Sequence, residues 1–167
     1  MAQATARRGL ARVTAITLLL ANVTSCQYDP FAHLYLTERP EEHEIAGHYV
    51  LTEESLPALE LTDLVAAIKL DEDGSYTAVE FPVARKPRTL SAAPGYRVTP
   101  PSNFDGTWSL QTLGSVDSGF GSEPMWGLKF DSPELRSAHL ASKDGRSQII
   151  FSFDDPDAGW ALVFTRE

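Results

Sequence analysis

Two Asp-Gly dipeptides, Asp73-Gly74 and Asp144-Gly145, constrain the fold of this chain more than any other feature. Each one separates two runs in which apolar and polar residues alternate. Such alternation places apolar side chains on one face of a strand, and glycine readily adopts the positive φ that a tight turn requires. Each dipeptide therefore predicts a β-hairpin.

Further strands are expected on both sides of these hairpins. The predicted strands cover 45–51, 68–70, 75–81, 104–110, 126–130, 135–141, 149–153 and 160–164. Segment 56–67 stays ambiguous, because Pro57 could open a short helix there. Short strands, regular turns and little helix predict an all-β fold, a single antiparallel β-barrel or a closely related sandwich of about eight strands. The expected core contains Trp108, Trp126, Phe151, Trp160, Leu162 and Phe164.

The stretch from Pro82 to Pro101 interrupts this pattern. It holds five prolines, no acidic residue, and the basic residues Arg85, Lys86, Arg88 and Arg97. A structureless loop this long is uncommon in a compact domain and is usually functional or disordered. Two interpretations stay open: a mobile crossover, and a contact surface for an acidic partner or lipid headgroups. The four basic residues are candidate binding residues. Phe120 is a further candidate, as an exposed anchor or as a lid over the barrel mouth.

The N-terminus has the composition of a targeting signal. Arg7, Arg8 and Arg12 stand in an acid-free segment, and the 11 residues of 13–23 that follow are mainly apolar. An apolar run this short cannot cross about 30 Å of hydrocarbon as a helix. A basic segment followed by a short apolar run and small residues is typical of a cleaved secretory signal. Residues 1–25 are therefore expected to be a signal peptide with an apolar helix. A mitochondrial-type presequence is the alternative.

The end of this segment, Val23-Thr24-Ser25-Cys26, resembles the bacterial lipobox, with valine in place of the usual leucine. The resemblance implies lipidation of Cys26, by palmitate or a similar fatty acid, and a membrane-anchored lipoprotein of the bacterial cell envelope that faces the periplasm or the exterior. Two or more acyl chains, at about 0.8 kcal/mol per buried CH₂, give stable anchoring. A buried free cysteine is the alternative.

Residues 26–44 are expected to form a tether between the anchor and the domain. As a flexible coil, a tether of this length would reach roughly 25 Å. Four of its residues are too apolar for a pure linker, so part of it is expected to dock on the domain. They are Phe31, Leu34, Tyr35 and Leu36.

Without residues 1–25 the chain keeps 142 residues, with 11 basic and 23 acidic side chains and a net charge of −12. That charge argues against binding of nucleic acid, and against adhesion of the whole domain to anionic lipid. Cys26 is the only cysteine, so no disulfide can form within the chain. Stability therefore has to come from a packed core.

Four short motifs follow one another along the mature chain. They are Gly47-His48-Tyr49, the Asp-Gly hairpin 70–76, Gly106-Thr107-Trp108 and Asp155-Pro156-Asp157. Their order resembles small bacterial lipoproteins with lipocalin-like (calycin-type) barrels, and the first is similar to the Gly-x-Trp of lipocalin first strands. The resemblance implies a lipocalin-like β-barrel domain over residues 45–167, and no activity.

No stretch carries a recognisable catalytic or cofactor signature. The chain has no Gly-x-Ser-x-Gly motif, no phosphate-binding loop and no free thiol for a nucleophile. His43-Glu44 and His48 lack the spacing of the zinc signature His-Glu-x-x-His. The acidic runs 71–73 and 154–157 could offer oxygen ligands to Ca²⁺, but neither has a twelve-residue loop with a closing glutamate. Neither an enzyme nor a metal or cofactor is expected.

Two functional hypotheses remain for this envelope protein. The first is a protein-binding module, such as an inhibitor or immunity-type lipoprotein, whose acidic surface suits a basic partner. The second is a lipocalin-like barrel that binds a small molecule, since small barrels either fill with side chains or hold one ligand. The first is preferred because the 16 aromatic residues are enough to fill a small barrel.

Overall fold

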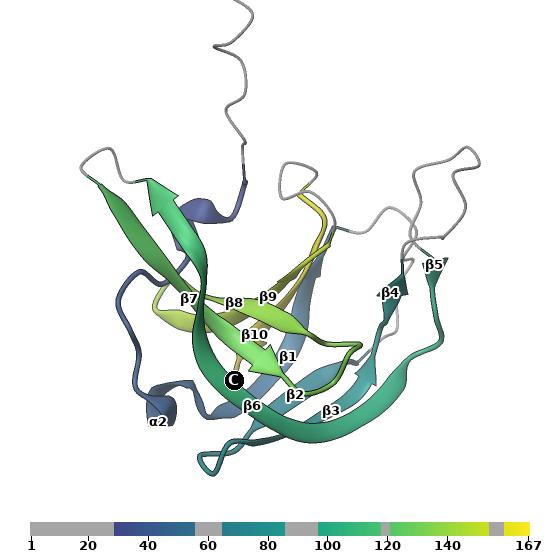
Figure 1. Ribbon diagram of the computed structural model, residues 1–167. Coiled ribbons are helices and arrows are strands. Elements are labelled where there is room, and N and C mark those ends of the chain that lie inside the picture. Colours follow the sequence, from purple (N-terminus) through teal and green to yellow (C-terminus); the bar gives the residue numbers. More distant parts are fainter. Residues whose placement is uncertain (1–28, 56–64, 86–96, 118–120, 154–158) are drawn as a thin grey trace, which may run out of the picture.

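The computed structural model describes residues 29–55, 65–85, 97–117, 121–153 and 159–167, which form a closed barrel of antiparallel strands (Figure 1). Its eight strands are β1 (Gly47–Glu54), β2 (Ala67–Leu70), β3 (Ser75–Phe81), β6 (Ser102–Asp117), β7 (Ser122–Phe130), β8 (Ser137–Lys143), β9 (Arg146–Ser152) and β10 (Ala161–Arg166). They follow one another around the wall, and β10 pairs with β1 to close it. The all-β prediction is confirmed, as a barrel rather than a sandwich.

Both predicted Asp-Gly turns are present. In the β2–β3 hairpin Gly74 has φ of 83°, and its N–H donates to the Asp71 carbonyl at 3.1 Å. In the β8–β9 hairpin Asp144 and Gly145 have φ of 53° and 76° between the paired residues Lys143 and Arg146. Two successive positive φ values are typical of a type I′ turn, whose twist matches that of the strands it joins.

The first strand begins later than predicted. Ile45 and Ala46 precede it, because Ile45 ends the short helix α2 (Glu42–Ile45), and β1 runs on to Glu54. A reciprocal pair of hydrogen bonds between Glu41 and Glu44 caps this helix. The Tyr49 hydroxyl donates to the Ile45 carbonyl at 2.6 Å inside the protein, and burial raises the pKa of Tyr49 to about 12.

The stretch 82–101 is not structureless at its two ends. Pro82 and Val83 are buried, and β4 (Ala84–Arg85) pairs with β5 (Arg97–Val98) in a two-stranded ribbon. The Thr99 N–H donates to the Val83 carbonyl at 3.0 Å and so closes the base of this ribbon. Residues 82–85 and 97–99 therefore do not belong to a structureless crossover. Residues 86–96 lie outside the described part of the chain, as do 56–64 of the ambiguous segment, while Ala67 and Ile68 belong to β2.

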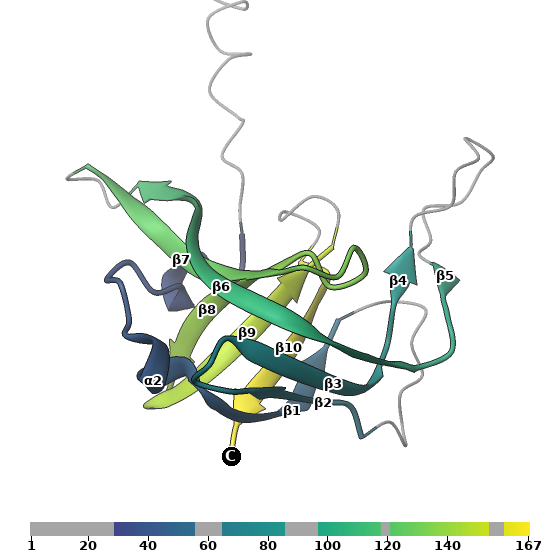
Figure 2. The ribbon, with the colours of Figure 1, turned by 60° about the horizontal axis from the view of Figure 1, so that its bottom comes forward.

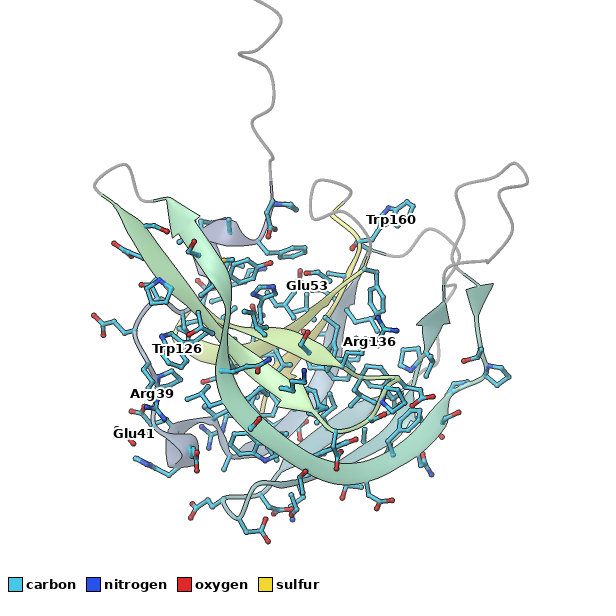
Figure 3. The ribbon with its side chains drawn as sticks, viewed as in Figure 1. Arg39, Glu41, Glu53, Trp126, Arg136 and Trp160 are labelled. Carbon is cyan, nitrogen blue, oxygen red and sulfur yellow. The ribbon has the colours of Figure 1, made fainter. Side chains whose placement is uncertain are left out.

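Only one of the three tryptophans is buried as predicted. Trp108 is 6% exposed and lies in the core, whereas Trp160 packs at the margin of the core and is partly exposed. The prediction of Trp126 as a core residue is wrong. The pairing of β7 with β8 ends at Gly127, so Trp126, which precedes Gly127 in β7, lies where the two strands separate and is partly exposed. The Arg39 guanidinium lies over the Trp126 ring, 5.5 Å from its centroid (Figure 3).

Within the part of the chain that the structure describes, no helix combines the length and the apolar character needed to cross a membrane.

Candidate functional site

The barrel interior is the first place where a ligand could bind, and aromatic side chains fill it. Phe81 lies at its centre, with ring centroids 5.0 Å from Phe151, 5.5 Å from Phe164 and 6.4 Å from Phe104. Phe130 continues this cluster, stacked on Phe151 at 5.7 Å. Such spacings are those of aromatic pairs in direct contact.

Burial of the surrounding side chains shows that this packing is continuous. A void large enough for a ligand would leave accessible surface on the side chains around it. Seven residues of the interior cluster have 0% exposure and come from β1, β2, β3, β7, β9 and β10: Tyr49, Ile68, Ala78, Leu128, Ile149, Leu162 and Phe164. The described interior is therefore a packed core.

The N-terminal segment, residues 29–36, completes the barrel wall where β7 and β8 separate. These two strands pair only through Gly127–Lys129 and Ser137–His139. Beyond that point the Leu36 N–H donates to the Leu140 carbonyl at 2.9 Å, and the Leu36 carbonyl accepts from the Trp126 N–H at 2.9 Å. Residue 36 thus joins the two strands through its own backbone. This satisfies polar groups that the separated strands would leave without partners.

The same segment covers an apolar patch on the outside of the wall. Its residues Phe31, Ala32, Leu34 and Tyr35 pack against Ala141, Ile150, Ala161 and Val163. A short 3₁₀ helix, η1 (Ala32–Leu34), shapes the segment, and Tyr35 bridges to Ala141 of β8. Asp29 fixes its beginning, since one carboxylate oxygen accepts from the Phe31 N–H and the other from the Tyr35 hydroxyl, each at 2.8 Å. The predicted docking of these residues is confirmed.

A histidine lies under this segment. The His139 ring of β8 stacks on the Tyr35 ring, with centroids 4.4 Å apart and planes inclined by 20°. Its Nδ1 atom is buried without a hydrogen-bond partner. Burial lowers the pKa of His139, and the negative charge of Asp29 opposes that shift only in part. The neutral imidazole therefore acts as a flat packing surface for Tyr35.

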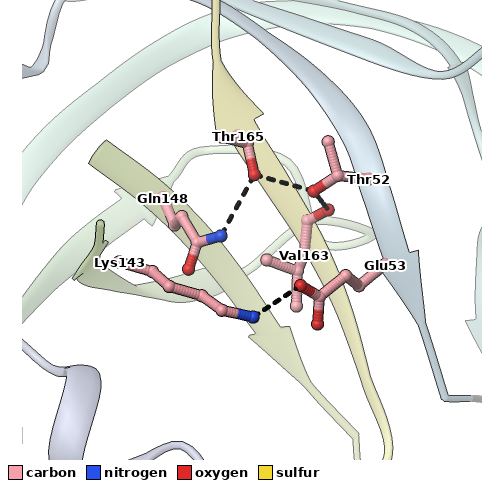
Figure 4. Close-up of polar contacts among 6 residues, drawn as sticks. All are labelled: Thr52, Glu53, Lys143, Gln148, Val163 and Thr165. Atoms are coloured by element: carbon pink, nitrogen blue, oxygen red, sulfur yellow. Dashed lines mark hydrogen bonds and ion pairs between the residues drawn. The ribbon is translucent and has the colours of Figure 1, made fainter. Parts of the chain in front are cut away.

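Polar side chains on the adjoining wall form a structural network (Figure 4). The Gln148 amide donates to the Thr165 hydroxyl at 3.1 Å, and this hydroxyl lies 2.7 Å from the hydroxyl of Thr52. Lys143 of β8 pairs with Glu53 of β1 at 2.8 Å, across the two strands between them. Both partners of this ion pair are about half exposed, so it contributes little to stability.

The residues expected from the sequence to form a binding site are only partly described. Arg85 of β4 and Arg97 of β5 are direct partners in the ribbon register. The structure therefore brings these two basic positions together from opposite ends of the acid-free stretch. Four sequence candidates lie outside the described residues: Cys26, Lys86, Arg88 and Phe120.

The acidic and histidine motifs take structural roles where they are described. His48 Nδ1 lies 2.8 Å from a carboxylate oxygen of Glu167, and His43 lies exposed on α2. Asp73 accepts hydrogen bonds from the N–H and hydroxyl of Ser75, which lower the pKa of this carboxyl. Among the described residues no group of three or more histidine, cysteine or acidic side chains could hold a metal ion. The acidic run 154–157 falls outside them, together with Asp155 of the expected closing hairpin.

Sequence reasoning found the apolar character of the N-terminal segment but not its place in the barrel wall. Leu36 contributes through backbone groups, which every residue type carries, so its role leaves no mark on the sequence. His139 left a weak signal, a polar residue in the strand 135–141 between apolar neighbours.

Comparison with known proteins adds no assignment to this geometry. No family model matches the chain, and no curated protein and no solved structure gives a significant match.

Proposed function

We propose that this chain is a non-catalytic, lipid-anchored protein of the bacterial cell envelope that faces the periplasm or the exterior and binds another protein. Its lipocalin-like barrel serves as a rigid support, and its function is of the inhibitor or immunity type. The observation that carries this proposal is the filled interior. A barrel whose centre is occupied by Phe81, Phe151 and Phe164 offers its outer surface, rather than its lumen, for recognition.

The filled interior also separates the two hypotheses drawn from the sequence. Eight-stranded barrels either fill with side chains or hold one small ligand. Binding of a small molecule at the centre would require the stacked Phe81 and Phe164 rings to part, and would expose side chains that are now fully buried. This observation supports the protein-binding module over the small-molecule-binding barrel.

The anchor and the partner are supported by the sequence. The lipobox-like Val23–Cys26 favours acylation at Cys26, as described above. The net charge of −12 of the mature chain favours a basic protein partner, since complementary potentials accelerate association. Neither nucleic acid nor a cofactor is part of this proposal.

A soluble form of the mature chain, with Cys26→Ser, tests the function. Purified under native conditions, it is expected to have the mass of the polypeptide alone in native mass spectrometry. When immobilised, it should retain a specific envelope protein that elutes with salt. A small molecule that co-purifies in equimolar amount would support the ligand-binding barrel instead.

The anchor is tested separately with the full chain. Cys26→Ser is expected to move the protein from the membrane to the soluble fraction and to abolish labelling by a fatty-acid analogue, while the melting temperature stays that of the parent. Membrane retention of a parent chain that takes up no label would exclude the lipid anchor.

A further inference from the structure

We propose that one end of the barrel, the anchor end, lies directly against anionic phospholipid headgroups of the membrane that carries the protein. The anchor end comprises Pro30, Ser55, Val65, Gly159 and the ribbon β4–β5. This inference rests on the proposed lipidation of Cys26. It specifies which surface of the barrel faces the bilayer and which surface stays accessible to a protein partner.

The length of chain before the barrel is the first observation. Asp29 is held to residues that pack on the wall, since its carboxylate accepts from the Phe31 N–H and the Tyr35 hydroxyl. Only residues 27 and 28 separate Asp29 from Cys26. Three extended residues span at most about 11 Å, so the acylated cysteine holds the barrel close to the bilayer. A fully flexible tether of residues 26–44 would reach roughly 25 Å, whereas residues 31–36 of it lie on the wall.

The place where this segment begins is the second observation. A Cβ atom on Gly159 would lie 3.3 Å from Pro30 Cγ, and the Ser55 hydroxyl donates to the Gly159 carbonyl at 2.5 Å. The start of the described chain therefore lies beside the end of β1 and the approach to β10. In Figures 1 and 2 this region and the β4–β5 ribbon lie toward the same end of the barrel, opposite α2 and the β2–β3 turn.

Strand direction gives the same placement. Neighbouring strands around the barrel are antiparallel, so β1 and β3, which flank β2, run in the same direction. The residues that follow both strands, Ser55 and the ribbon that begins at Ala84, thus leave the wall at one end. Val65, which precedes β2 at this end, is 73% exposed, more than any other large apolar side chain among the described residues.

The distribution of charge is the last observation. The anchor end carries the two basic positions Arg85 and Arg97, which are direct partners in the register of β4 and β5. The opposite end carries exposed acidic residues on and beside α2 and in the β2–β3 turn, namely Glu41, Glu42, Glu44, Glu72 and Asp73. An anionic bilayer therefore attracts the two arginine positions of the ribbon and repels α2 and the β2–β3 turn, although Asp29 and Glu53 lie at the anchor end and Lys143 and Arg146 at the opposite end.

The test places one thiol-reactive fluorophore at either end of the lipidated full chain. Because the acylated Cys26 does not react, Val65→Cys marks the anchor end and Glu72→Cys, also at an exposed position, marks the opposite end. Each labelled protein is reconstituted in vesicles of phosphatidylethanolamine and phosphatidylglycerol with a quencher on the headgroup of a minor lipid. The seven residues of β3 separate the two ends by about 18 Å at a strand tilt of about 40°, which headgroup quenching can resolve.

The probe at 65 is expected to lose several-fold more fluorescence than the probe at 72. Inserting a long Gly/Ser linker between residues 28 and 29, together with Arg85→Glu and Arg97→Glu, should bring the two losses to the same value. Equal quenching of both probes in the parent chain, or stronger quenching at 72, would overturn the proposal. Absence of fatty-acid label would instead refute the anchor. Loss of protein capture would leave the orientation unaffected, so the three failures are distinguishable.

Discussion

The rings of Phe81 and Phe164 lie parallel across the barrel, with centroids 5.5 Å apart and planes inclined by 6°. Phe81 ends β3 and Phe164 belongs to β10, and two other strands, β2 and β1, separate them along the shorter way around the wall. The contact therefore spans the lumen and joins two distant parts of the sequence. The two stacked rings therefore occupy the position in the lumen that a ligand would need.

Truncation of this stack should be among the most destabilising single changes. Phe81→Ala is expected to lower the free energy of unfolding by about 3–5 kcal/mol, because it removes a ring that is 1% exposed and leaves a cavity. Phe81→Leu retains much of the volume and should cost less. Urea unfolding of both variants measures the difference. An alanine variant as stable as the parent would show that the interior is not packed as described.

Two tryptophans in neighbouring strands should differ in their effects. Trp108→Ala is expected to cost about 3–5 kcal/mol of unfolding free energy, because the ring is buried and its indole N–H donates to the Asp71 carbonyl at 3.2 Å. Trp126→Ala removes a partly exposed ring and its contact with Arg39, which is worth about 0.5–1 kcal/mol. Melting temperatures of the two variants compare these sites. A larger effect at Trp126 would contradict its assignment to the margin of the wall.

The backbone role of Leu36 can be separated from its side chain. Leu36→Ala loses apolar contact but keeps the N–H that donates to the Leu140 carbonyl, whereas Leu36→Pro loses both. The proline variant should be less stable than the alanine variant by about 1–3 kcal/mol, the cost of leaving a buried carbonyl without its donor. Equilibrium unfolding of the pair gives this difference directly. Equal stability would mean that residue 36 contributes only through its side chain.

The partly buried His139 predicts a pH dependence of stability. Because the pKa of folded His139 lies below its unfolded value of about 6.5, the unfolded chain binds a proton first as the pH falls. The stability associated with the neutral form of His139 is fully present above about pH 6.5, and it is lost as the pH falls toward the lowered pKa of the folded state.

His139→Phe provides the matched control for that dependence, since it keeps an aromatic ring against Tyr35 and cannot titrate. Carboxyl groups, including Asp29, titrate in both proteins. The parent should therefore lose more stability than the variant between pH 7 and pH 5, measured by unfolding at each pH. Parallel pH profiles would show that His139 does not titrate differently in the two states.

The basic stretch predicts a salt-dependent contact that is independent of folding. Reversal of Arg85, Lys86 and Arg88 to glutamate should leave the melting temperature unchanged and weaken capture of anionic vesicles at low salt. Reversal of the exposed Lys69, Lys129 and Arg146, which lie in β2, β7 and β9, changes the net charge by the same amount and is the control. Equal loss of vesicle binding in both variants would point to overall charge rather than to this stretch.

The local structure of the barrel could be predicted from the sequence because its signals are local. Alternation of apolar residues identified the inward faces of strands such as 104–110, where Phe104, Trp108 and Leu110 contribute to the core. The Asp-Gly pairs fixed two hairpins through the backbone freedom of one or two residues. The candidate site was less accessible, since the prediction named basic residues but could not place Arg85 opposite Arg97.

By itself, the sequence determined the eight barrel strands to within a few residues at most of their ends, most of their inward faces and the two tight turns, because each depends on residues within a few positions of one another. Closure, register and the end of each pairing were decided only by the tertiary structure. Register shifts between Leu51 and Glu53, and between Thr112 and Gly114, adjust the strands to the curved wall. Trp126 is partly exposed because β7 and β8 separate beside it, and the segment 29–36 bridges these two strands through Leu36. These contacts join residues distant in the chain, so their free energy arises only once the barrel has formed.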